Sequence, residues 1–271
     1  MTAQGKISFD NPPVVETVFS VQFMPIQEFS TANVGRYAME CLDKDWQEFK
    51  ESHRVEDHFE RFGEPIGIPR APSFRILTDI EPNRIQIVRA DQQRMIQVQN
   101  TRFIFNWKKH ESPYPTFEVL FSEFSSYLLQ FCNFAKKYLK TEIEFNQWEM
   151  THVNHFLRGE ELWSSPTNWS DLLPRLFAAD LPAENFETFG GQWSFRLPED
   201  KGRLYLNLNH GRIGTPFGPE ALIMNIMARG PIEKTGILPF KSEFHDAHTG
   251  INKIFETVTN SQIQCDIWGK K

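Results

Sequence analysis

Residues 95–107 read MIQVQNTRFIFNW, and this stretch decides the fold because a short turn separates two runs of alternating residues. In the first run isoleucine and valine alternate with glutamines, and in the second every other residue is aromatic. Strand side chains point alternately to the two faces of a sheet, so each run predicts a β-strand. Asn100-Thr101 fits a two-residue hairpin turn. The stretch therefore predicts two antiparallel strands, over 95–99 and 102–107.

Further elements surround this hairpin in the N-terminal half. Residues 117–138 carry phenylalanine and leucine at helical spacing after Pro113 and Pro115, which predicts a long amphipathic helix. Alternating stretches predict strands, and closely spaced prolines and glycines predict a loop. The expected elements are a strand over 14–23, a helix over 30–51, a loop over 53–73, and strands over 74–77 and 84–89.

The C-terminal half repeats this order of elements. Its expected elements are a strand over 143–157, a helix over 169–178, strands over 189–197, 203–209 and 221–228, and a helix over 244–258. Both halves read β-α-β-β-β(-β)-α. We therefore expect an α+β fold of two similar halves, 1–140 and 141–271, with antiparallel sheets and helices packed on one face. An internal duplication would explain the repetition, although chance can also produce two similar strings.

The composition is that of a folded, acidic chain. Of its 271 residues 40% are hydrophobic, and 25 are phenylalanine, which predicts an aromatic core. The formal net charge of −6 disfavours nonspecific binding to nucleic acid. Three separated cysteines do not form a disulfide framework, and no apolar run has the length of a signal peptide core or a membrane span. We expect a cytoplasmic protein with no membrane contact.

Motifs for metal binding and catalysis are missing. His152 and His155 lie on a predicted strand and point to opposite faces, which suits them poorly as joint metal ligands. His245 and His248 share a helix face, but two ligands do not complete a zinc site. No HExxH, GxSxG or P-loop sequence occurs. We expect no metal and no cofactor, and an enzyme only if its site is dispersed along the chain.

Two other stretches have both a structural and a functional interpretation. The glycine-rich run 209–219 connects two predicted strands, and its alternative role is a lid or a partner-binding loop. Basic residues between 84 and 109 accompany Phe103 and Trp107, an arrangement that can stack nucleic-acid bases. Solvated strand faces are the simpler interpretation of these basic residues, because the sequence pattern of RNA-binding strands is absent.

The polar residues of the 95–107 hairpin are the candidate binding residues. Alternation places the two glutamines of the first strand outward, where their amides can line a groove and hydrogen-bond a ligand or a peptide. An ordinary polar sheet face is the alternative. The candidate ligand- or partner-binding residues are Gln97, Gln99, Arg102, Asn106 and Trp107.

Three segments carry a resemblance to a known family. They are 11–16 (NPPVVE), 96–107 (IQVQNTRFIFNW) and 114–115 (YP). In this order they resemble a sporadically distributed family of bacterial conserved hypothetical proteins, over the whole chain but more loosely in the second half. The resemblance implies no established active site or cofactor. The patchy distribution of that family is similar to that of mobile-element, toxin–antitoxin or phage-defence genes, which implies a role beside a partner protein.

These observations lead to three hypotheses for the function. The first is a non-enzymatic, partner-binding component of a bacterial defence, antitoxin or immunity-type system. The second is a small-molecule or nucleotide sensor with its ligand in a groove between the halves. The third is an enzyme with a dispersed site. A protein partner is expected, a nucleic-acid partner is less favoured, and the oligomeric state stays open. Near the first strand, Glu16 is expected to pair with a basic hairpin residue such as Arg102.

Overall fold

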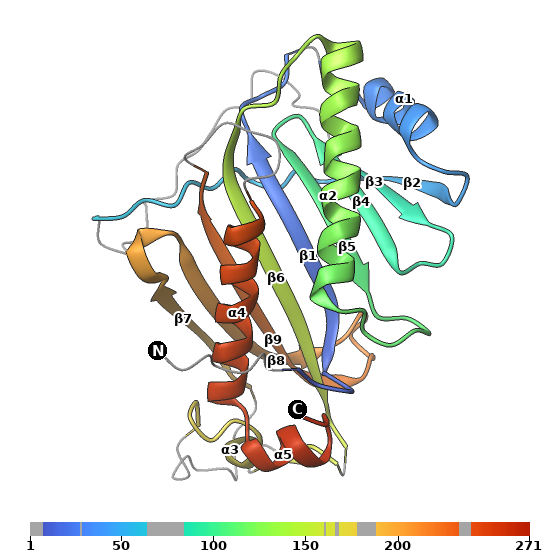
Figure 1. The fold of residues 1–271 in the computed structure, drawn as a ribbon. Helices are drawn as coiled ribbons and strands as arrows, with labels where there is room; N and C mark the ends of the chain where they lie inside the picture. Colours follow the sequence, from blue (N-terminus) through green and yellow to red (C-terminus); the bar gives the residue numbers. More distant parts are fainter. Residues whose placement is uncertain are drawn as a thin grey trace.

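The computed structural model of the chain describes residues 8–27, 29–63, 84–159, 161–165, 168–177, 188–232 and 240–271. Figure 1 shows the arrangement of the helices and strands. In chain order they are β1 (Val14–Phe23), α1 (Thr31–Cys41), β2 (Trp46–Ser52), β3 (Arg84–Arg89), β4 (Arg94–Gln99), β5 (Arg102–Lys108), α2 (Phe117–Phe134), η1 (Ala135–Leu139), β6 (Phe145–Leu157), α3 (Trp169–Leu172), β7 (Gly190–Arg196), η4 (Pro198–Asp200), β8 (Arg203–Arg212), β9 (Glu220–Pro231), α4 (Lys241–Val258) and α5 (Ser261–Asp266).

The strands form one nine-stranded antiparallel sheet in the order β2-β3-β4-β5-β1-β6-β9-β8-β7. The first strands of the two halves, β1 and β6, pair at its centre. In each half the last strand returns to pair with the first, β5 with β1 and β9 with β6. The predicted α+β class and order of elements are confirmed, and the strands of both halves share one sheet. Descent of the halves from a duplication stays a prediction, as does their division at residue 140.

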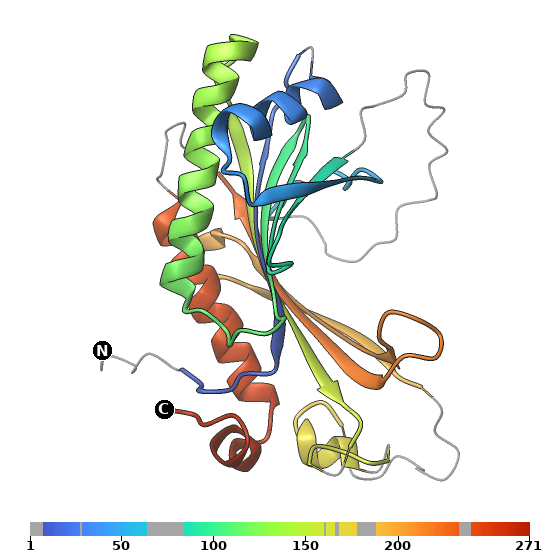
Figure 2. The same ribbon diagram turned by 90° about the vertical axis from the view of Figure 1, so that its right-hand side faces the viewer.

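The helices α1, α2 and α4 cover one face of the sheet, and no helix of the described residues lies on the other face (Figure 2). Alternation along β1 directs Phe19 under the helices, where it is fully buried. Its ring centroid lies 5.4 Å from that of Phe124 on α2 and 5.6 Å from that of Phe244 on α4. Aromatic contacts of this kind add to the stability from burial alone. The predicted aromatic core therefore lies between the sheet and α2 and α4.

The helix predicted over 30–51 is wrong in its second part. α1 begins after Ser30, whose side chain caps it, but it ends at Cys41. The side chain of Asp43 then accepts a hydrogen bond from the backbone N–H of Asp45, at 2.9 Å, and turns the chain into β2. Trp46 is buried in the core, whereas Phe49 is 48% exposed. The prediction interpreted the helical spacing of Trp46 and Phe49 as one apolar helix face, but only Trp46 belongs to the core.

The remaining predictions are mostly confirmed. Gln99 pairs with Arg102 across the expected two-residue turn, and the glycine-rich run connects β8 to β9. The helix predicted over 169–178 is only the short α3, and the described chain there stops at 177. The strand predicted over 74–77 lies outside the described residues. Within the described ranges, no helix has the length and apolar character that crossing a membrane requires.

Candidate binding sites on the two faces of the sheet

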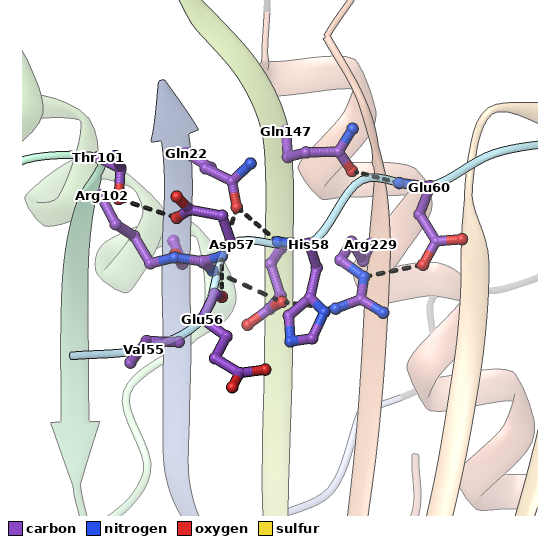
Figure 3. A network of polar contacts seen from close by, with 12 residues as sticks. Gln22, Val55, Glu56, Asp57, His58, Glu60, Thr101, Arg102, Gln147 and Arg229 are labelled. Atoms are coloured by element: carbon purple, nitrogen blue, oxygen red, sulfur yellow. Dashed lines mark hydrogen bonds and ion pairs between the residues drawn. The ribbon is translucent and has the colours of Figure 1, made fainter. Parts of the chain in front are cut away.

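On the helix-free face, an extended piece of the same chain lies across the strands. This crossing segment, residues 53–62, follows β2 and runs over β5, β1, β6 and β9 (Figure 3). It has no regular secondary structure, so its backbone polar groups need partners outside a strand ladder. Side chains of the sheet supply those partners.

Amide side chains bind the main chain of the crossing segment. Gln99 accepts a hydrogen bond from the N–H of Val55 and donates one to its carbonyl oxygen, both at 3.0 Å. Gln22 accepts from the N–H of His58, also at 3.0 Å. The amide of Gln147 accepts from the N–H of Glu60 in the same way. Two guanidinium groups also bind the segment's main chain, since Arg102 donates to the Glu56 carbonyl and Arg203 to the Arg61 carbonyl. The sheet face therefore binds extended main chain through side chains of several strands.

The crossing segment also buries one carboxylate, that of Glu60, which is only 3% exposed. Glu60 accepts hydrogen bonds from Arg203, from Arg229 Nε at 2.8 Å, and from the Tyr205 hydroxyl at 2.6 Å. Burial alone would raise the pKa of Glu60, but the hydrogen bonds from these three side chains and the charge of Arg229 lower it below its ordinary value. Glu60 is therefore held ionised, as an internal carboxylate ligand of two arginines.

Four of the five predicted binding residues lie on this helix-free face and are buried. Gln97 donates to Asn106 at 2.7 Å and accepts from Gln86 at 3.0 Å, while Gln99 binds the crossing segment. Arg102 donates to the side-chain oxygen Oε1 of Gln22 at 2.6 Å. Their hydrogen-bonding atoms are thus largely engaged within the chain.

The fifth residue, Trp107, points to the opposite face. It is fully buried on the helix-covered face, and its ring centroid lies 5.1 Å from that of Tyr114. The expected partner of Glu16 is also different, since Glu16 pairs with Lys108 at 3.9 Å rather than with Arg102. Residues 16 and 108 are direct neighbours across β1 and β5, whereas Arg102 lies at the other end of the strand.

A cavity of about 330 Å³ lies on the helix-covered face. Its walls come from the arm before β1, the start of α2, strands β6 and β9, and α4. The lining residues are Ser8, Phe9, Pro12, Pro13, Val14, Tyr114, Thr116, Phe117, Glu118, His152, Asn154, Ile226, His248, Ile251, Asn252 and Phe255. It therefore lies between the two halves, although not at the predicted hairpin residues.

His152 is the most unusual polar group of this cavity. Its side chain is 7% exposed, and its Nε2 atom has no hydrogen-bond partner in the described part of the chain. Burial, and less strongly the nearby His248, lower the pKa of His152 to about 3. His152 is therefore a neutral imidazole at physiological pH. Its ring centroid lies 5.9 Å from that of His248 and 6.2 Å from that of Tyr114.

The described residues show no arrangement typical of a metal site or of a reactive cysteine. Among them, no group of three or more His, Cys, Asp or Glu side chains is placed to hold a metal. His245 and His248 both lie against Phe117, which explains their shared helix face through packing. Burial raises the pKa of Cys132 to about 12, so its thiol stays protonated.

Comparison with known proteins adds no assignment: no protein-family model matches the chain, and no curated protein matches its sequence. The resemblance carried by the three N-terminal segments therefore stays a prediction.

Proposed function

We propose that the protein is a non-enzymatic binding protein that docks on a partner protein through the helix-free face of its sheet. The partner would contribute an extended, acidic segment. The supporting observation is the crossing segment, whose main chain and buried carboxylate this face already binds. A peptide of another chain with the same features would meet the same amides and arginines.

The crossing segment is separable from the architecture of the sheet. It leaves after Ser52 at the end of β2, and the chain returns at Arg84, the first residue of β3. These two residues pair directly, and the Arg84 guanidinium donates to the Ser52 hydroxyl at 2.9 Å. The register of the neighbouring strands therefore does not depend on the chain between them.

Charge favours an acidic occupant on this face. Arg102 and Arg229 approach Glu149, at 3.7 and 3.6 Å, and Arg203 has its carboxylate partner in Glu60. Without the crossing segment, three arginines would face one glutamate. Buried or half-buried cations need anionic partners, so an incoming segment has to supply a carboxylate in the place of Glu60.

The tethered segment also sets a threshold for any partner. A segment on the same chain competes at an effective concentration on the order of millimolar. A partner must therefore bind the face tightly enough to displace a tethered segment at that effective concentration, or add contacts to the uncovered part of the face. Such self-occupancy would keep the surface closed until a specific partner arrives. The resemblance of the N-terminal segments supports the further proposal that this partner belongs to a bacterial defence, antitoxin or immunity-type system.

The experiment uses a labelled peptide of residues 53–63 and measures fluorescence polarisation with two proteins. One is the full chain with Glu60→Gln, which weakens the hold on its own segment. The other has residues 53–83 replaced by an Asn-Gly turn. Both should bind the peptide, whereas the unchanged full chain should not. A peptide carrying Glu60→Gln should bind at least about tenfold more weakly, because hydrogen bonds to charged groups contribute about 1.5–3 kcal/mol.

Three outcomes would contradict the proposal. Equal binding of the acidic and the Glu60→Gln peptide would show that the arginines do not favour a segment that carries a carboxylate. Failure of the peptide to bind either variant, with both folded by circular dichroism, would make the segment purely structural. Stronger binding of a single-stranded oligonucleotide than of the peptide would favour a nucleic-acid partner instead.

A further inference from the structure

The cavity on the helix-covered face is separate from the proposed docking surface. α2 and α4 lie over β1, β6 and β9 on this side of the sheet (Figure 1). Phe117 of α2 stacks on His248 of α4, with ring centroids 4.3 Å apart, and both line the cavity. Phe9, in the arm before β1, meets Phe255 of α4 edge to face at 5.5 Å. Residues from both halves thus form a chamber whose walls include the rings of Phe9, Tyr114, Phe117, Phe255 and two histidines.

An orphaned polar atom in a buried position points to a ligand. Most buried polar groups in proteins have a hydrogen-bond partner, and leaving one unmade costs about 1–3 kcal/mol. His152 Nε2 is such an unpaired atom, in a side chain more than nine-tenths buried that lines the cavity. Its neighbours His248 and Asn252 bind each other instead, at 3.1 Å between Nε2 and Nδ2. Among the described residues that line the cavity, His152 Nε2 and the Tyr114 hydroxyl are the buried atoms that lack a partner.

The charges of the lining restrict the class of ligand. Among the described residues that line the cavity, Glu118 is the one acid, and lysine and arginine are absent. An anion would lose its hydration without gaining a cationic partner, and the Glu118 carboxylate would repel it. The imidazole of His152, being neutral, offers a hydrogen bond but no compensating charge. An uncharged ligand avoids these penalties.

Size and wall chemistry restrict the ligand further. About 330 Å³ lies at the lower end of the volumes of small-molecule sites, which are commonly apolar with a few convergent polar groups. Aromatic walls contact the flat face or edge of a planar ring better than a flexible chain. We infer that this cavity binds a small, uncharged, planar heteroaromatic molecule of nucleobase size, hydrogen-bonded to His152.

The test uses the purified full chain labelled with ¹⁵N-histidine. The probes are adenine, indole and the matched pair nicotinamide and nicotinate, which differ in charge at nearly equal shape. We expect at least one neutral probe to shift the His152 side-chain resonance saturably, and nicotinate to bind at least about tenfold more weakly than nicotinamide. Denaturing the protein from its native host should release a molecule of the same class, detected by mass spectrometry.

Two variants and one control locate the binding. His152→Phe should abolish the shift in thermal stability that the neutral probe causes, and Ile251→Phe should do so by filling the cavity while leaving His152 in place. His155→Phe is the matched control, because it makes the same change on the same strand but on the other face, and should bind normally. Absence of any saturable shift of His152 would overturn the inference. Equal binding of nicotinate, or binding retained in both cavity variants, would do so too.

Discussion

Replacing His152 with phenylalanine should change how the stability of the protein depends on pH. In the folded state the pKa of His152 is lowered to about 3, and in the unfolded chain it returns to about 6.5. Between these values the unfolded state binds a proton that the folded state does not. Stability is therefore lost as the pH falls below about 6.5, and the loss continues towards pH 3.

The size of this effect follows from the two values. Going from pH 7 to pH 5, proton uptake by the unfolded chain at this one residue lowers the free energy of unfolding by about 2 kcal/mol. The result hardly changes if the folded value is one unit higher, because the folded imidazole would still be neutral at pH 5. The His152→Phe variant has no titrating group at this position, so it should lose about 2 kcal/mol less over this range.

The assay is urea-induced unfolding of both proteins at pH 7, 6 and 5, with the difference in unfolding free energy plotted against pH. Tyr114, His248 and Glu118 line the same cavity and are present in both proteins, as are all other carboxylates. Their contributions largely cancel in the difference, and so does any constant packing cost of the larger ring. A difference that stays flat from pH 7 to pH 5 would refute the reasoning, because the imidazole would then accept a proton inside the folded protein.

Three other substitutions test the packing and the crossing segment. Glu60→Gln should cost about 3–5 kcal/mol in thermal or urea unfolding, because it leaves the buried Arg203 without a carboxylate. Glu142→Gln on the surface should leave stability unchanged, and equal effects of the two substitutions would mean that the Glu60 ion pair is not formed. Gln99→Ala should speed hydrogen exchange at the Val55 amide and cost about 1 kcal/mol, and unchanged exchange would disprove that contact. Trp46→Ala should cost about 3–5 kcal/mol, as expected of a core residue of β2. A loss below about 1 kcal/mol would contradict the burial of Trp46 in the core.

The sequence predicted the features that depend on neighbouring residues. Alternation along 95–107 located a hairpin because side chains two apart share a face, whatever the rest of the chain does. The same rule placed His152 and His155 on opposite faces. Helical spacing misled the prediction at Trp46 and Phe49, because the chain turns into β2 through a hydrogen bond to the side chain of Asp43.

The two candidate sites depend on contacts that local patterns do not contain. Glu60 and Arg203 are 143 positions apart, and nothing near Glu60 marks it as a residue that will be buried. The sequence predicted outward-facing amides at Gln97 and Gln99 but not the segment that covers that face. Likewise, the unpaired Nε2 of His152 results from the joint packing of α2, α4 and the arm before β1.

The direct pairing of Ser52 with Arg84 has a consequence for how such a chain can evolve. The stretch between them works as an exchangeable cassette, since its two ends are fixed side by side whatever lies between them. We expect insertions, deletions or recombination there to change the segment that crosses the sheet while β2 and β3 keep their pairing. Among related chains, sequence drift should therefore concentrate in this cassette, and the amides and arginines beneath it should change in step with it.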